Sequence, residues 1–195
     1  STPEQQITAD KEGRAWESCM TLNDSWGYQR ADDDWKSSRR VIQNVISCSR
    51  DTGNYLLNIG PRADGSVPEE TVRVLTEVGQ WMRRNGDSIY ASDPCQPRRS
   101  NYASFTRKGN TLYMHVHFWP GDYVVVGGLQ AQVKSARFFA SGEKIDFRQD
   151  KYRVRLTGLP AEGPDHPITT IALECDAEPT QDNIFVRKEK PREGV

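Results

Sequence analysis

The sequence lacks an excess of charge of either sign. Its 195 residues contain 26 lysines and arginines against 27 aspartates and glutamates, a formal net charge of −1 at pH 7. Nucleic-acid-binding domains normally present a basic face, so this balance argues against that class of protein. Hydrophobic residues make up 35% of the chain, enough for a core, and the length suits one large domain or two small ones.

Long hydrophobic runs and leader-like sequence are also missing. The chain has no run of 18 apolar residues, so we expect no membrane span. The opening residues 1–4 are neither basic nor apolar, so we expect no signal peptide there.

Cysteines are few and widely spaced, at positions 19, 48, 95 and 175, which excludes a zinc site built on a close cysteine pair. Cys48 falls on an apolar helical stripe and Cys175 ends an apolar strand. Both positions predict buried free thiols, although halves of disulfides remain an alternative.

The pattern of the chain changes near residue 93. Before it we expect loop, helix, strand, loop and helix, and after it a series of short strands. The junction SDPCQPRRSN (92–101) carries two prolines, which indicates a linker. The sequence thus predicts a first domain over 1–92, a linker over 93–101, a second domain over 102–190 and a tail over 191–195.

Two helices and one buried strand are expected in the first domain. Apolar residues recur at helical spacing after Asp32–Asp34, and a second helix opens at Pro68 and ends near Gly86. The stripes that we expect to be buried are Val41, Ile42, Val45, Ile46 and Ser49 in the first helix, and Leu75, Val78 and Met82 in the second.

Between the two helices, the run NYLLNIG (54–60) fits a strand covered on both faces in a parallel sheet. One such strand cannot close a sheet, because its backbone groups need neighbouring strands. We therefore expect these residues to be the end of a larger α/β domain that begins before residue 1.

The second half alternates apolar and polar residues over short runs, with turns at 108–110 and 120–122. Strands at about ten-residue spacing predict an antiparallel sandwich or barrel. His115 and His117 share one face of a strand, which favours a half-exposed sheet face over a metal pair. Trp119 and Tyr123 flank a turn, where they fit either the core or a sugar-stacking surface.

Aromatic rings and carboxylates gather between residues 16 and 38. The stretch WESCMTLNDSWGYQRADDDWKSS holds three tryptophans, four aspartates and one glutamate. Rings beside acids suit a pocket that cleaves sugars, but they also occur in well-packed loops. The run Asp32–Asp34 is interpreted as a solvated helix start and not as a metal site, because no histidine or further acid stands at ligand spacing.

Five blocks of the first half together resemble the α-L-fucosidases of glycoside hydrolase family 29. They occur in the family's order and are TPEQ (2–5), WESCMTLNDSWGY (16–28), WKSS (35–38), GNYLLNIGPRADGSVPEE (53–70) and GQWMRRNGDSIYAS (79–92). Residues 100–190 match only in kind, as the β-sandwich that follows the catalytic barrel. The resemblance therefore implies the C-terminal portion of a (β/α)8-like barrel followed by an antiparallel β-sandwich.

The resemblance also implies a retaining mechanism, with an aspartate nucleophile and a carboxylic acid/base. It places the nucleophile and the histidines that hold the sugar hydroxyls before residue 1, since the only histidines here are His115, His117 and His166. We expect this chain alone to be inactive and to need the N-terminal half of the barrel, from the same polypeptide or from a separate chain.

Two glutamates match positions that the family uses for the acid/base. We favour Glu4 as the proton donor and Glu17 as a pocket or orienting carboxylate, with the reverse assignment as the alternative. Trp16 and Trp26 are the expected substrate-binding residues, and Trp16, beside Glu17, would also exclude water from that carboxylate. Trp26 matches the aromatic wall around the C5 methyl group of fucose, and a core tryptophan is the alternative.

Hydrolysis by two carboxyl groups needs no cofactor and no metal. The implied substrate is a glycan with terminal α-L-fucose, and the implied enzyme is a retaining exo-α-L-fucosidase. The alternatives are a non-catalytic carbohydrate-binding module and a fragment that only completes a barrel. Glycan-degrading enzymes tend to be secreted, periplasmic or lysosomal and often self-associate, but neither the compartment nor a homo-oligomer follows from these residues.

Overall fold

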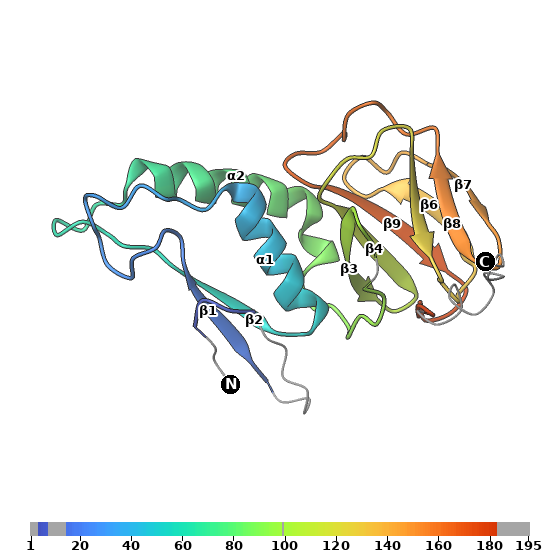
Figure 1. The fold of residues 1–195 in the computed structure, drawn as a ribbon, viewed down its shortest axis with the longest axis horizontal. Helices are drawn as coiled ribbons and strands as arrows, with labels where there is room; N and C mark the ends of the chain where they lie inside the picture. The colour runs from blue at the N-terminus through green and yellow to red at the C-terminus, as the bar shows by residue number, and fades with distance from the viewer. Residues whose placement is uncertain (1–3, 8–14, 99, 183–195) are drawn as a thin grey trace, which may run out of the picture. The chain divides into compact units, whose positions relative to one another are not determined.

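The computed structural model describes residues 4–7, 15–98 and 100–182. Its contacts divide the chain into two compact units, residues 1–92 and 93–195 (Figure 1). The predicted tail over 191–195, and residues 183–190 of the predicted second domain, lie outside the described residues.

The first unit is an α/β layer around two parallel strands. Strand β1 (Glu17–Thr21) pairs in parallel with β2 (Asn54–Asn58). Helix α1 (Ser38–Arg50) connects them, and helix α2 (Glu69–Asn85) with the short 3-10 turn η1 (Gly86–Ser88) follows β2. The helices and β2 were predicted, whereas β1 was missed because its residues, ESCMT, are mostly polar and lie within the stretch interpreted as a loop.

One face of this strand pair is covered by the two helices. Val41 of α1 and Val74 of α2 are buried in one cluster with Leu22, and Leu57 of β2 packs against it. Alternation along a strand sends Cys19 and its register partner Leu56 to the opposite face. Leu56 is 48% exposed there, whereas Thr21 on the same face is buried, so the described residues leave the second face open around Leu56.

The start of α1 differs from the prediction. The helix begins at Ser38, the Ser37 side chain accepts a hydrogen bond from the Arg40 backbone N–H at 3.2 Å, and no acid stands in the first turn. A serine hydroxyl is a preferred N-cap, so the run Asp32–Asp34 is left in the preceding loop.

The buried stripe of α2 is also offset from the predicted one. Val74 and Trp81 are fully buried, whereas Leu75, which we expected in the core, is 38% exposed. A stripe through 71, 74, 78, 81 and 85 satisfies the same helical spacing, and it buries the large indole of Trp81.

The second unit consists of two antiparallel sheets. A four-stranded sheet has the order β3-β4-β9-β6, and a three-stranded sheet has the order β5-β8-β7 (Figure 1). Their strands are β3 (Ala103–Lys108), β4 (Thr111–Val116), β5 (Tyr123–Gly127), β6 (Val133–Phe138), β7 (Asp146–Gln149), β8 (Arg153–Thr157) and β9 (Thr169–Cys175). Side chains from both sheets share one core, which includes Phe105 and Met114 from the first sheet and Val126 and Leu156 from the second.

The predicted linker begins with residues that belong to this second unit. The Asp93 backbone N–H donates to the Arg107 carbonyl at 2.8 Å, and Cys95 is buried in the core of the two sheets. Residues 93–95 are therefore held by the unit that follows them.

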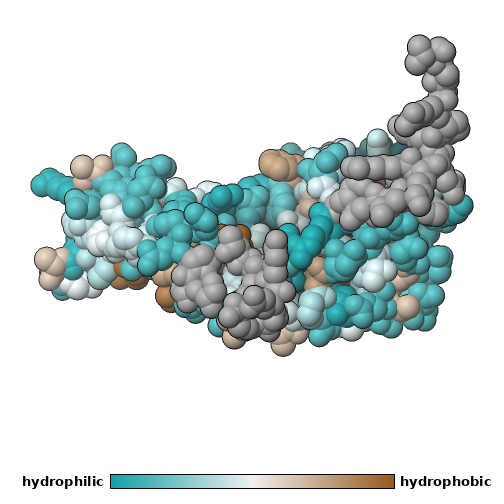
Figure 2. All heavy atoms as spheres, turned by 60° about the horizontal axis from the view of Figure 1, so that its bottom comes forward, coloured by the Kyte–Doolittle hydropathy of each residue, from teal (hydrophilic) through white to brown (hydrophobic). Residues whose placement is uncertain are grey.

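The face of the molecule drawn in Figure 2 is mostly polar. On the face drawn in Figure 2, hydrophobic residues appear only as small separate areas. No helix in the described part of the chain is long and apolar enough to cross a membrane. All four cysteines are free, and Cys48 and Cys175 are buried as predicted.

Candidate functional site

The first unit brings two loops together where β1 and β2 end. The strands run in parallel with Thr21 opposite Asn58, so their carboxyl ends lie at the same edge. The loops over residues 22–37 and 59–68 leave from this edge. In parallel α/β folds, binding sites form at the carboxyl ends of the strands, so this edge is the candidate site.

The two loops touch at a pair of glycines. A Cβ atom added at Gly60 would lie 2.8 Å from the Gly27 carbonyl carbon and 2.9 Å from its oxygen. Only glycine at position 60 allows this approach, because backbone atoms cannot move aside as a flexible side chain can. The contact fixes the loop that carries Trp26.

Exposed aromatic rings lie on either side of Gly27. Trp26 is 44% exposed and Tyr28 is 41% exposed. The Arg62 guanidinium carbon of the second loop lies 5.5 Å from the centroid of the Tyr28 ring, within cation–π range. Trp26 is thus an accessible ring on a braced loop and not a core tryptophan, while Tyr28 and Arg62 are neighbours that the sequence did not single out.

Polar groups line the end of β1. The Thr21 hydroxyl accepts a hydrogen bond from Gln5 Nε2 at 2.8 Å and donates one to the Asn23 carbonyl. Asn58, opposite Thr21, accepts from the Leu22 N–H through its backbone oxygen at 3.0 Å. The side-chain oxygen of Asn58 is buried and has no hydrogen-bond partner among the described residues.

Glu4 lies beside β1 on a short extended segment. It pairs with Cys19 in the parallel sense, and the next residue, Gln5, donates its backbone N–H to the Cys19 carbonyl at 2.8 Å. Gln5 has a left-handed φ of 54°, and the segment stays in contact with β1 after it, because the Gln6 carbonyl accepts a hydrogen bond from the Ser18 hydroxyl. Glu4 is exposed, and it is paired with the middle residue of β1.

Glu17 lies at the opposite end of β1. It is the first residue of the strand and pairs with Asn54, the first residue of β2. It is two positions before Cys19, which is about 7 Å along a strand. Glu17 is partly exposed on the face away from the helices, but it is farther than Glu4 from the edge that carries Trp26.

Trp16 is buried and does not line the candidate site. It is 4% exposed, its indole Nε1 donates to the Asp51 carbonyl at 3.0 Å, and its ring packs on Gly53. Trp16 thus packs at the start of the strands, away from the candidate site, and the contact with a substrate that we expected for it stays a prediction.

Residues considered for metal binding prove to be structural. His115 is fully buried, and its two ring nitrogens bond to Thr106 at 2.8 Å and Thr170 at 3.1 Å. His117 bonds to Ser104 at 2.8 Å. The half-exposed face expected for His115 is thus wrong. Within residues 4–7, 15–98 and 100–182, no three His, Cys, Asp or Glu residues converge on a metal position.

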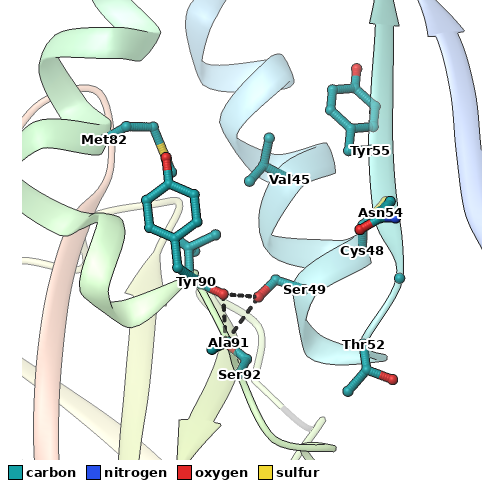
Figure 3. A pocket seen from close by; sticks show the side chains of 12 residues that line it. Val45, Cys48, Ser49, Thr52, Asn54, Tyr55, Met82, Tyr90, Ala91 and Ser92 are labelled. Carbon is teal, nitrogen blue, oxygen red and sulfur yellow. Dashed lines mark hydrogen bonds between the residues drawn. The ribbon is translucent and has the colours of Figure 1, made fainter.

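A cavity of about 450 Å³ lies elsewhere in the first unit. Figure 3 shows it between the last turn of α1 and the segment after η1, where the Ser49 hydroxyl donates to the Ile89 carbonyl and bonds to the Ser92 hydroxyl. Gly53 and Asn54 put this cavity at the amino end of β2. Binding sites of parallel α/β folds form at the opposite, carboxyl ends of the strands, so this cavity is not the candidate site.

Comparison with known proteins identifies the kind of fold. Residues 1–87 match the family model for alpha-L-fucosidase. The alpha-L-fucosidase of Dictyostelium discoideum is 32% identical over 117 residues, which cover 57% of this chain and 25% of that protein. Among solved structures, alpha-L-fucosidase isoenzyme 1 from Paenibacillus thiaminolyticus matches 90% of this chain and 44% of its own, with 34% identity and a TM-score of 0.81.

A second solved structure is that of the Thermotoga maritima alpha-fucosidase in complex with fucose. It is 25% identical, has a TM-score of 0.75, and is matched over 83% of this chain and 40% of its own. The matched parts of these relatives are thus less than half of their length. The chain thus has a mixed α/β fold with antiparallel sheets that is similar to part of these α-L-fucosidases, which are glycoside hydrolases. Residues 1–87 carry the match to the α-L-fucosidase family, and the chain is similar to part of the solved members.

Proposed function

We propose that this chain is the C-terminal portion of a retaining exo-α-L-fucosidase and forms the acid/base side of its sugar cleft. The observation that carries this proposal is Trp26, 44% exposed on a loop braced at the carboxyl ends of two parallel strands. The substrate is a glycan that ends in α-L-fucose.

The proposed architecture follows from the same observations. Residues 1–92 are the end of a (β/α)8-like barrel, and the two antiparallel sheets over residues 102–190 are a β-sandwich. The uncovered face at Leu56 supports the first assignment, because in a barrel the inward side chains of every strand are covered by those of the other strands. The shared core of the two sheets supports the second.

Glu4 is the proton donor in this proposal. A retaining glycosidase needs two carboxyl groups about 5–5.5 Å apart, one to attack the anomeric carbon and one to protonate the leaving oxygen. Glu4 pairs with Cys19 and so lies nearer to the carboxyl end of β1, whereas Glu17 begins its strand. Glu17 remains the alternative donor, and an orienting role fits its more distant position better.

Trp26 forms the apolar wall for the sugar. Fucose carries a methyl group at C5 where other hexoses carry a hydroxymethyl group, so an apolar ring there favours the deoxy sugar. A pocket gains about 1–3 kcal/mol from one well-placed methyl or methylene group. The attacking aspartate comes from a barrel portion outside residues 1–195, and the chain is inactive without that portion.

The proposal is tested with an aryl α-L-fucoside and the polypeptide that completes the barrel. We compare the unchanged protein with Glu4→Gln, Glu17→Gln and, as a matched control, Glu70→Gln at the exposed start of α2. General acid–base catalysis contributes about 10²- to 10⁴-fold, so Glu4→Gln should lower kcat within that range. Glu70→Gln should leave kcat unchanged.

Two outcomes would overturn parts of this proposal. If only Glu17→Gln lowers kcat, the donor is Glu17 and Glu4 is not catalytic. If the completed protein binds fucosylated glycans but hydrolyses no fucoside, the enzyme assignment fails and a non-catalytic carbohydrate-binding protein takes its place.

A further inference from the structure

The three-stranded sheet of the second unit has one face in the core and one in solvent. Val124, Val126, Val154 and Leu156 point into the core, and the residues that alternate with them point outward. We call the outward set the outer face; it consists of Tyr123, Val125, Asp146, Arg148, Arg153, Arg155 and Thr157.

Two arginines stand directly opposite each other on this outer face. Arg148 of β7 is the register partner of Arg155 of β8, and both are exposed. Arg153 lies two residues from Arg155 on the same face. Like charges directly across a sheet destabilise it. None of the three guanidinium groups has a carboxylate within ion-pair distance among the described residues.

An aromatic ring adjoins these charges. Tyr123 is 42% exposed, and the guanidinium carbon of Arg155 lies 3.9 Å from the centroid of its ring. Stacking on the ring holds the guanidinium in a fixed plane, which reduces the freedom lost when its N–H groups bind an oxyanion. The outer face therefore carries an oriented arginine beside a second arginine and an accessible ring.

A cavity of about 360 Å³ opens at the Tyr123 end of the outer face. Asp146 and Thr157 line it, and they occupy the same row across the sheet as Tyr123. Glu143 and Lys144 also line it. Carboxylate, hydroxyl and ammonium groups are hydrogen-bond partners for sugar hydroxyls, so the cavity offers polar contacts for a sugar ring beside the arginines.

We propose that the outer face binds a sulfated glycan, with a sulfate group between Arg148 and Arg155 and a sugar ring near Tyr123 and the cavity. The guanidinium fork matches an oxyanion with two parallel hydrogen bonds, and a bound sulfate removes the repulsion between the paired arginines. That the anion belongs to a glycan rests on the proposed function, whereas the anion site itself rests on the outer face alone.

The charges around the outer face argue against a long phosphodiester polymer. Asp122, Asp146 and Asp150 flank the arginines and are exposed, so the basic area ends within a few residues along each strand. A nucleic acid would extend past it onto carboxylates, while a glycan with isolated sulfates places one anion on the arginine pair and hydroxyls beside the acids.

Binding of dextran sulfate to the full chain, with unsulfated dextran as the matched ligand, tests this proposal. Replacing both paired residues, Arg148→Ala with Arg155→Ala, should weaken dextran sulfate binding by about tenfold or more at moderate salt. The control removes the same charge from α2 by Arg73→Ala with Arg83→Ala and should leave binding unchanged. Tyr123→Ala should weaken binding as well, and dextran should bind far more weakly throughout.

Equal binding by the paired-arginine variant and the control would overturn the anion site. Equal binding of dextran and dextran sulfate would also overturn the anion site. Binding of duplex DNA that is stronger than binding of dextran sulfate would show that the ligand is not a glycan. A protein that hydrolyses no fucoside but binds dextran sulfate through Arg148 and Arg155 would refute the proposed function and leave the anion site standing. A protein that hydrolyses the fucoside but does not bind dextran sulfate through Arg148 and Arg155 would refute only the anion site.

Discussion

The indole of Trp16 packs on Gly53 so closely that a Cβ atom at position 53 would lie 2.2 Å from two of its ring carbons. Trp16 precedes β1 and Gly53 precedes β2, so this contact ties the starts of the parallel strands together. The Trp16 indole N–H adds a hydrogen bond to the Asp51 carbonyl at 3.0 Å. The tryptophan next to Glu17 thus stabilises the sheet.

Gly53→Ala should destabilise the chain, because neither a buried indole nor the backbone can yield more than 1 Å without strain. Overpacking of this kind costs about 1–3 kcal/mol in the free energy of unfolding, which urea denaturation measures. Gly79→Ala on α2 is the control: no atom lies within 4 Å of its added Cβ, so it should be neutral or stabilising by about 1 kcal/mol. Equal stability of the two variants would disprove the contact.

Gly60→Ala should impair the candidate site without removing a polar group. The added methyl would meet the Gly27 backbone at 2.8 Å and push apart the loops that carry Trp26 and Arg62. In the completed enzyme we expect kcat/KM for an aryl α-L-fucoside to fall about tenfold or more, since small misplacements of positioning groups cost up to about 10²-fold.

The matched control for this prediction is Gly27→Ala, whose added Cβ meets no atom within 4 Å although it lies in the same contact. It should retain most of the activity. Comparable losses in both variants would mean that the loop contact does not position the site.

Trp26→Ala should weaken recognition of the methyl group of fucose. We expect kcat/KM for the fucoside to fall by about 10- to 200-fold, the range for one methyl or methylene group in an apolar pocket. The pentoside that lacks only this methyl group should lose much less. Equal losses for both sugars would show that Trp26 does not contact the methyl group.

His115 should make the second unit sensitive to acid. Burial, with a smaller contribution from the charge of His117, lowers the pKa of His115 from 6.5 to about 3. The unfolded chain then binds a proton below pH 6.5 that the folded chain binds only near pH 3. The free energy of unfolding should therefore be retained above pH 6.5 and fall by about 1.4 kcal/mol per pH unit below it.

His115→Gln tests this linkage, since an amide can still bond to Thr106 and Thr170 but does not titrate. Between pH 6 and 4, the variant should lose stability less steeply than the unchanged chain, whose carboxyl groups are otherwise the same. If the free energy of unfolding, measured by urea denaturation, falls equally steeply with pH in the variant and the unchanged chain, the lowered pKa of His115 does not cause the acid sensitivity.

Local sequence pattern predicted much of the fold. The apolar spacing around Ile42 and Ile46 predicted α1, and the run at 54–58 predicted β2 as a parallel strand. The antiparallel strands of the second unit and the turn at Gly109, which has a φ of 53°, also follow from alternation and turn residues. Strand β1 was not predicted, because its residues are mostly polar and only its pairing with β2 identifies it as a strand.

Relationships across strands could not be predicted in the same way. That Trp16 is buried and Trp26 exposed depends on which end of the parallel pair each occupies, and both are tryptophans beside polar residues in the sequence. The pairing of Arg148 with Arg155 likewise depends on the register of β7 and β8. Trp26 could be proposed from its sequence motif, but its neighbours Tyr28 and Arg62 meet only in the folded chain.

The central claim is that Glu4 passes the proton in a retaining α-fucoside hydrolysis, and azide rescue tests it most directly. With an activated aryl fucoside, Glu4→Gln in the completed enzyme should still form the glycosyl-enzyme but hydrolyse it slowly, because no base activates water. Added azide needs no base, so it should restore turnover and yield a fucosyl azide of retained configuration. Unchanged turnover in Glu4→Gln, or a slow variant that azide does not accelerate, would contradict the account.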